Sequence, residues 1–440
     1  MKPGFACSAS EENLQDWRLS INGRFTSLRG AAALIVMLAH YQYIGFLPAL
    51  PAFKYSGQCG LMVFFFLSSF LLSHSLATDR NWPMRRRLSL LTYAINRIFR
   101  IFPLLCAVIA LTYWNRASFF PPSIDFWQAL RLSATLGKAP GVLWTIPVEL
   151  MFYLYLPFVL AVALPATRTR LGAAILALTY LAWCVAIAVA RHEGALASPW
   201  MTLGFHHYAN SFVGGVLLYA LIANGCIRFT PATAWVASVT PLAFLLATPF
   251  CQFALVRHDP LMAALAAPGA WQSYYDAIFP FAPLVVGGIV YGLLHPAQSL
   301  LSRVMEVALL RKTGELSFGV YLIHMPMIVL FGSRYGYGPL QFCAAIAATF
   351  GAAAQLSALI ERPGIGLGRK LGDWLLACAA AGPASPLTGQ APEGMEAGYG
   401  VGLGSVGCYP RPATRATPTR SGDGAGSRRS TLLISMLSRN

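Results

Sequence analysis

About ten apolar segments, each long enough to cross a lipid bilayer, follow one another along this 440-residue chain. A membrane-spanning helix needs roughly 20 mostly apolar residues. In lipid the backbone N–H and C=O groups must be paired within the protein, so each such segment is expected to be an α-helix. The sequence predicts an all-α polytopic membrane protein, a bundle of about ten transmembrane helices, at 25–47, 58–77, 98–115, 143–164, 171–190, 205–223, 232–256, 277–294, 315–332 and 339–360.

The charged residues indicate how this bundle is oriented. Only 11% of the residues are charged, compared with about 25% in soluble domains. The net charge is +16, and the basic excess lies mostly in the loops 78–97, 165–170 and 295–314 and in the C-terminal region. With ten alternating helices these loops share one side, which the positive-inside rule assigns to the cytoplasm. Both termini are then expected to be cytoplasmic, and nucleic acid is not an expected partner.

Three regions follow from composition. Residues 1–24 contain no apolar run, so we expect a cytoplasmic N-terminal segment without a cleavable signal peptide. Residues 25–370 form the transmembrane domain. Residues 371–440 are rich in Gly, Pro, Ser, Thr and Arg, and we expect a basic, low-complexity, disordered cytoplasmic tail.

Several common chemistries have no matching motif. Nine cysteines are scattered along the chain without a CxxC pair, and several lie inside apolar segments, where cysteine acts as a small hydrophobic residue. The chain also lacks a Walker sequence, an HExxH zinc motif and a GxSxG nucleophile elbow. We therefore expect no metal site and no bound cofactor, and neither an ATP-driven pump nor a metalloprotease.

Arg29 and His40 carry ionisable groups into the first apolar segment. They lie eleven residues apart, which is three turns of an α-helix, so both side chains face the same way. Their separation along the helix axis is roughly 16 Å. A charge at this depth costs about 2.5–3.5 kcal/mol on insertion scales, and such residues usually pair with a partner or serve a function. We predict that the two belong to a reaction site.

Arg97 and Arg100 open the third apolar segment. Residues at i and i+3 share a helix face, so the two guanidinium groups form a paired site suited to phosphate. The alternative is ordinary anchoring at the cytoplasmic interface by side chains that extend toward water.

Glu149 stands within the fourth apolar segment with no acidic neighbour, so it needs a cationic or protonated partner. Contact with His40 would orient that histidine and raise its basicity, as general-base chemistry requires. A structural pair with an arginine is equally compatible with the sequence. Ser68 lies in an aromatic stretch of the second segment that reads mainly as a packing surface, with Ser68 itself a candidate to line a cavity.

His324 precedes Pro326 in the ninth segment. It can be a second catalytic group, a substrate ligand, or a neutral histidine bonded to a backbone carbonyl beside the proline. The sequence favours the last.

Six stretches, in order and with matching spacing over about residues 25–370, resemble the acyltransferase family 3 of integral membrane proteins. They are Leu28-Arg29-Gly30 with His40 (Arg-x10-His), Gly60 to Ser68, Arg97 to Arg100 (RxxR), Leu143 to Tyr153 (LWxxxxExxFY), Tyr321 to Pro326 (YLxHxP) and Glu361-Arg362-Pro363. Two positions depart from the pattern: Met62 stands where members often carry an acidic residue, and Ser69 where they carry glycine.

The resemblance implies an O-acyltransferase that moves an acyl group, acetyl in the usual case, from cytoplasmic acyl-CoA to a hydroxyl of a cell-envelope or lipid-linked carbohydrate. Its location would be the bacterial inner membrane, and its partners the donor, the glycan or glycolipid acceptor and the bilayer. The roles expected of individual residues are catalysis by His40, Arg29 and Glu149, acyl-CoA binding by Arg97, Arg100 and Arg86, and lining of the substrate space by Ser68, Tyr153, Tyr321 and His324.

A second hypothesis comes from another class of protein. A transporter or exporter of an acylated or carbohydrate metabolite could line a passage with the same buried polar groups. Dependence on acyl-CoA separates the two, because transport needs no covalent change. The Arg29–His40 spacing and the Arg97–Arg100 pair favour the enzyme, and a purely structural role is the least favoured.

Overall fold

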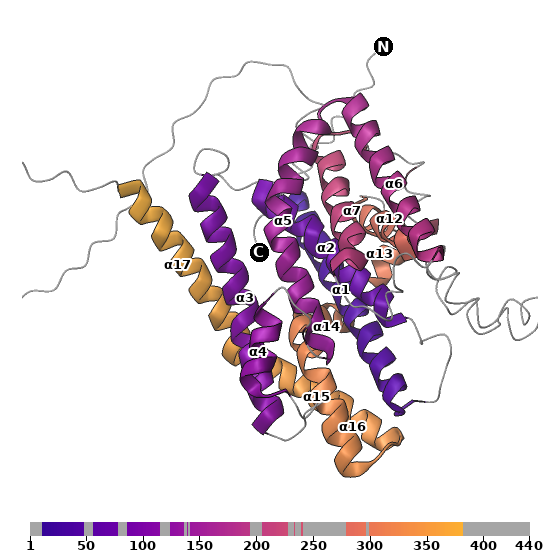
Figure 1. Ribbon diagram of the computed structural model, residues 1–440, viewed down its shortest axis with the longest axis vertical. Helices are drawn as coiled ribbons and strands as arrows, with labels where there is room; N and C mark the ends of the chain where they lie inside the picture. Colours follow the sequence, from indigo (N-terminus) through magenta and orange to yellow (C-terminus); the bar gives the residue numbers. More distant parts are fainter. Residues whose placement is uncertain are drawn as a thin grey trace, which may run out of the picture.

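The computed structural model describes residues 11–47, 56–77, 86–114, 124–135, 139, 141–193, 205–227, 233, 239–240, 279–295 and 299–381 (Figure 1). Within these residues all regular structure is helical. The first half contains α1 (Glu11–Ile44), α2 (Ser56–Ala77), α3 (Arg86–Trp114), α4 (Phe126–Ala134), η2 (Gly141–Trp144), α5 (Thr145–Ala166), α6 (Arg170–His192) and α7 (Phe205–Ala223).

The second half contains η3 (Phe279–Phe281), α12 (Ala282–Leu294), α13 (Leu300–Val304), α14 (Ala308–Glu315), α15 (Ser317–Tyr335), α16 (Pro339–Leu356), a π-helical turn η4 (Ser357–Glu361) and α17 (Arg362–Ala381). Figure 1 shows α17 lying along α3 at one side of the bundle, with α6, α7 and α12 together at the other. α1 and α2 run between these groups.

The all-helical membrane fold is confirmed in the described residues, but ten spans are not. Five helical stretches are long and apolar enough to cross a membrane, or six if the bent pair α14–α15 counts as one span. Tyr208–Ala223 and Phe279–Leu294 are apolar but shorter. The expected span at 232–256 lies almost entirely outside the described residues.

The expected boundary at residue 370 falls inside a helix. α17 continues to Ala381, so residues 371–381 are helical. The rest of the expected tail, 382–440, lies outside the described residues.

α1 and α14 cross at two glycines that bring their backbones into contact. A Cβ atom added at Gly30 would overlap the carbonyl oxygen of Leu310, and one added at Gly314 would overlap the carbonyl oxygen of Thr26. Small residues at helix crossings allow this close approach. Arg29 is next to Gly30, so this crossing fixes the position of the arginine.

We expect Gly30→Ala to destabilise the protein. The methyl group meets backbone atoms of α14 that cannot move independently, and overpacking of this kind typically costs about 1–3 kcal/mol. Thermal unfolding in detergent measures the effect as a lower apparent Tm. Gly351→Ala on α16 is the matched control, because a Cβ there meets nothing within 4 Å. Equal melting temperatures for the two variants would contradict the close crossing.

Three glycines spaced four residues apart face α3 from α17. Cβ atoms at Gly364, Gly368 and Gly372 would approach α3 at Phe99 and Thr92. The glycine-rich stretch of α17 is therefore a helical surface that packs against α3. The close approach also brings the next side chain, Arg369, to the edge of the cavity described below.

The departure at Ser69 is accommodated by α7. Its hydroxyl donates a hydrogen bond to the carbonyl oxygen of Phe66 at 2.7 Å, so the buried polar group is satisfied. Gly215 of α7 lies directly against this serine, where any Cβ would clash. Nearby, the rings of Phe152 and Phe212 stack with centroids 4.1 Å apart and join α5 to α7. Met62, the other departure, is fully buried in this core.

Candidate active site

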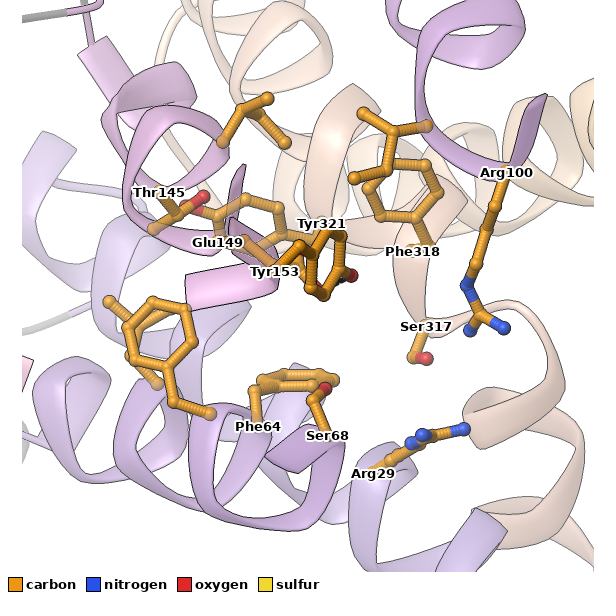
Figure 2. Close-up of a pocket in the computed structure, with 14 residues that line it drawn as sticks. Arg29, Phe64, Ser68, Arg100, Thr145, Glu149, Tyr153, Ser317, Phe318 and Tyr321 are labelled. Atoms are coloured by element: carbon orange, nitrogen blue, oxygen red, sulfur yellow. Dashed lines mark hydrogen bonds between the residues drawn. The ribbon is translucent and has the colours of Figure 1, made fainter. Parts of the chain in front are cut away.

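A cavity lies among α1, α2, α3, α5 and α15, with about 670 Å³ of empty space when the part open to solvent is included (Figure 2). Its wall combines aromatic side chains with a set of polar ones. The polar and ionisable lining residues are Arg29, Ser68, Arg100, Thr145, Glu149, Tyr153, Ser317 and Tyr321. Figure 2 shows Arg29 and Arg100 reaching toward one another at one end, with Ser317 between them. The first helix, the RxxR pair and the LWxxxxExxFY stretch thus meet at one place.

A wider space of about 1190 Å³ adjoins this cavity. The two adjacent spaces are joined by five shared lining residues: Arg29, Ser68, Arg100, Glu149 and Tyr153. The wider part adds Arg97 from α3 and Arg369 from α17. Four arginines therefore surround the region, and Glu149 is the one carboxylate among its described lining residues.

The arginines of the cavity are not neutralised by direct ion pairs. Among the described residues, the one salt bridge within 4 Å joins Arg24 and Glu306 at 2.8 Å. Neither of these residues lines the cavity or its wider extension. The guanidinium of Arg97 lies over the rings of Tyr93 and Tyr153, 5.9 Å from each centroid, and its Nε atom is buried without a hydrogen-bond acceptor. Buried guanidinium donors without acceptors favour an anionic ligand.

Glu149 lies beside the arginines, and its hydrogen bond comes from a tyrosine. The hydroxyl of Tyr153, one helical turn along α5, donates to Oε1 of Glu149. Glu149 lines the same space as Arg29 and Arg97 but makes no salt bridge with either. The expected contact with His40 is not made, because α5 packs with Glu149 level with Arg29, three turns from His40 along α1.

His40 is paired instead with His324. The rings lie 5.0 Å apart between centroids, and Nδ1 of His40 is 3.1 Å from Nε2 of His324. Neither histidine is among the residues that line the two joined spaces. His324 is completely buried, and Nδ1 of its ring lies 2.6 Å from the carbonyl oxygen of Tyr321 and 3.2 Å from that of Val320. The histidine bonded to a backbone carbonyl, which the sequence favoured, is therefore the arrangement in the structure.

These contacts assign the ring protons. A carbonyl oxygen only accepts, so Nδ1 of His324 donates to Tyr321, and the neutral ring has its lone pair on Nε2. Nδ1 of His40 faces two acceptors, that lone pair at 3.1 Å and the carbonyl oxygen of Val36 at 2.9 Å. It therefore carries the proton. The lone pair of His40 is left on Nε2, which is the form a general base or nucleophile needs.

Tyr321 connects the histidine pair to the cavity. Its ring lines the cavity, and its hydroxyl donates to the carbonyl oxygen of Val142 at 2.6 Å and accepts from Thr145 at 3.0 Å. Its own carbonyl holds His324. The histidine pair is thus one residue removed from the cavity wall.

The structure brings together most of the residues expected from the sequence. Arg29, Ser68, Arg97, Arg100, Glu149, Tyr153 and Tyr321 line the joined spaces, while His40 and His324 form a second group behind Tyr321. The side chain of Arg86 lies outside the described part of the structure. Arg369 was not among the expected residues. The signal for it was the four-residue spacing of the α17 glycines, which indicates a helix packed closely on a neighbour.

Among the described residues, no group of three or more His, Cys, Asp and Glu side chains is arranged to hold a metal ion. The described cysteines are free thiols; Cys59 and Cys184 are buried, Cys106 is partly buried, and Cys226, Cys343 and Cys378 are exposed.

Comparison with protein families gives one match that covers most of the chain. A family model described as an acyltransferase domain matches residues 22–357. Of the residues that line the two joined spaces, the match includes all except Ile365 and Arg369, which lie on α17. Comparison with curated proteins and with solved structures gives no match.

Proposed function

The chain belongs to the acyltransferase family whose model matches residues 22–357, and from this premise we propose that it is an integral membrane O-acyltransferase. The proposed donor is acyl-CoA, with acetyl as the acyl group. The proposed acceptor is a hydroxyl of a cell-envelope or lipid-linked carbohydrate, and the proposed location is the bacterial inner membrane.

The observation that carries this proposal is the cavity whose arginines lack direct carboxylate partners. Acyl-CoA bears several phosphate charges at one end and a thioester at the other. Guanidinium groups bind phosphate through paired hydrogen bonds and cannot lose their charge at physiological pH. Arg97, Arg100 and Arg369 would hold the phosphates, and Arg29 and Ser68 face the space into which the rest of the donor extends.

The proposed orientation places the arginine end of the cavity toward the cytoplasm. The basic residues around the start of α3 mark the cytoplasmic side by the positive-inside rule. Arg97 and Arg100 lie on α3 some three turns after its first residue, Arg86. Acyl-CoA is made in the cytoplasm, so the donor would enter there. His40 lies roughly 16 Å further along α1 than Arg29, toward the opposite face.

His40 is the proposed general base. Its Nε2 lone pair removes the proton from the acceptor hydroxyl, and the oxygen attacks the thioester carbonyl. The carbon–sulfur bond then breaks, and the CoA thiolate leaves and takes up a proton. Arg29, roughly 16 Å from His40 along α1, is the proposed partner of the acyl donor. In a variant of this scheme, Nε2 itself attacks the thioester and an acyl-histidine passes the group to the acceptor.

The contacts of Glu149 give it a different proposed role from orienting His40. Its carboxylate accepts from Tyr153 and offsets part of the charge of the surrounding arginines. It would hold Tyr153 against the donor and keep the empty cavity from being excessively positive.

We expect Arg369→Ala to raise the KM for acetyl-CoA about threefold to tenfold with little change in kcat. Arg369 lies at the exposed edge of the cavity, where one charge–phosphate contact is worth about 1 kcal/mol because water screens it. Lys370→Ala is the matched control, since Lys370 is the next residue on α17 and does not line the cavity. Equal KM values for the two variants would remove Arg369 from the donor site.

Proteoliposomes test the proposed function as a whole. The purified protein is reconstituted into liposomes with a cell-envelope glycan fraction, and acetyl-CoA labelled in the acetyl group is added outside. The release of free CoA and the movement of the label across the membrane are both followed. Acyl transfer predicts CoA release that requires both the protein and the glycan. Movement of an intact carbohydrate or acylated metabolite without consumption of acetyl-CoA would contradict the enzyme and support a transporter.

A further inference from the structure

We propose that His324 is the positioning residue of the reaction, holding the His40 ring by accepting a hydrogen bond at Nε2 from Nδ1 of His40. The inference rests on the proposed function, in which Nε2 of His40 is the base. It assigns a task to the YLxHxP histidine that differs from substrate lining, since His324 lines neither of the joined spaces.

His324 is held more firmly than a histidine in a side-chain pair alone. Its Nδ1–H donates to the Tyr321 carbonyl at 2.6 Å, and the Val320 carbonyl lies 3.2 Å away. No part of the residue is exposed. With the proton fixed on Nδ1, the Nε2 lone pair points outward from α15 toward α1. His324 therefore offers His40 an acceptor in a set position.

The contact matters most when His40 has taken up a proton. At that moment its ring is a cation, and the bond from Nδ1–H to His324 joins a charged donor to a neutral acceptor. Hydrogen bonds of this kind are roughly twice as strong as neutral ones. His324 thus stabilises the protonated form of the base more than the resting form, which favours proton removal from the acceptor hydroxyl.

A neutral partner suits this location better than a carboxylate. Within the described contacts, the single Nδ1–H of His40 is shared between the Val36 carbonyl and Nε2 of His324, and no carboxylate contacts the ring. A buried carboxylate would add a charge in the membrane interior, which is costly. An imidazole supplies the acceptor without that charge.

The pair is also linked to the cavity wall. Tyr321 holds His324 through its carbonyl, and its own hydroxyl is fixed to Val142 of η2 and to Thr145 at the start of α5. The ring of Tyr321 lines the donor cavity. The wall of the cavity and the base behind it are therefore held by one connected set of hydrogen bonds across α5, α15 and α1.

Three substitutions of His324 separate positioning from packing. In His324→Gln the side-chain oxygen reaches about as far as Nε2 of histidine and can accept from His40. In His324→Asn the amide ends at the level of Nδ1, too short for the contact, and His324→Leu has no acceptor. We expect kcat to fall about threefold to tenfold in the Leu and Asn variants, because His40 loses one of the two acceptors that share its Nδ1–H while the Val36 carbonyl remains. The Gln variant is expected to regain most of the rate, with the KM for acetyl-CoA unchanged in all three.

A spectroscopic readout separates this inference from the proposed function. The readout is the NMR resonance of the Nδ1–H proton of His40 in protein labelled with ¹⁵N-histidine. This resonance is identified because it is missing from the spectrum of His40→Gln. We expect that resonance to shift upfield in His324→Leu and to stay near its wild-type position in His324→Gln. This shift is expected whether or not acyl transfer is observed, so inactivity of the wild type would contradict the proposed function alone.

The result that overturns the inference is a His324→Leu variant that keeps both the wild-type kcat and the wild-type His40 resonance. Reduced activity shared equally by the Gln, Asn and Leu variants would also overturn it, because that pattern indicates packing. The double variant His40→Gln with His324→Leu is expected to be no slower than His40→Gln alone, since His324 acts through His40.

Discussion

Replacing His40 by glutamine is expected to lower the kcat of acyl transfer by roughly 10²–10⁴-fold, the usual contribution of a general base. The affinity for acetyl-CoA should hardly change, because the arginines that would hold the donor lie roughly 16 Å away along α1. Steady-state kinetics on purified protein, together with equilibrium binding of acetyl-CoA, measure the two quantities separately.

A second buried histidine serves as the control. His74 on α2 is buried beside Tyr219 and lines neither the cavity nor its wider extension. His74→Gln is expected to keep kcat near the wild-type value in protein that remains folded in the membrane. Wild-type turnover by His40→Gln would remove His40 from the chemistry.

Removing Arg97 and Arg100 together is expected to raise the KM for acetyl-CoA by about 100-fold or more. Each guanidinium–phosphate hydrogen bond contributes about 1.5–3 kcal/mol, and each 1.4 kcal/mol is a factor of ten. The kcat at saturating donor should change much less. Conversion to lysine is expected to recover only part of the affinity, because lysine lacks the paired donors of arginine.

A truncated donor tests where this binding energy comes from. Acetyl-pantetheine carries the thioester without the phosphates, so its KM should be the same for the wild type and for the Arg97→Ala, Arg100→Ala double variant. Arg334→Ala, at the far end of α15, is the control and should leave both KM values unchanged. An equal loss for both donors would show that the arginines act on the fold or on the thioester.

Features that depend on neighbouring residues could be predicted from the sequence. The eleven-residue spacing put Arg29 and His40 on one face of α1, and the i, i+3 spacing put Arg97 and Arg100 on one face of α3. Both follow from helix geometry alone. The apolar segments likewise predicted an all-helical membrane fold, although ten spans are not confirmed: five or six helices among the described residues are long and apolar enough to cross a membrane.

Contacts between helices could not be predicted in the same way. The sequence predicts a contact between Glu149 and His40 because both stand within apolar segments and are chemically complementary. The depth of α5 relative to α1, however, is set by side-chain packing across the bundle. That packing placed Glu149 level with Arg29 and left His40 beside His324. Arg369 was missed for the same reason, since only the glycine-mediated approach of α17 to α3 brings it to the cavity.

The central claim is that His40 performs acyl transfer with a donor held at the arginine-lined cavity. Its most direct test is to add acetyl-CoA labelled in the acetyl group to purified protein in nanodiscs with a cell-envelope glycan fraction. Label on glycan or protein and the release of free CoA are followed for the wild type and for His40→Ala. We expect CoA release and transferred label that both require His40. CoA release and labelling that are the same in His40→Ala, or a wild type that neither binds nor consumes acetyl-CoA, would contradict it.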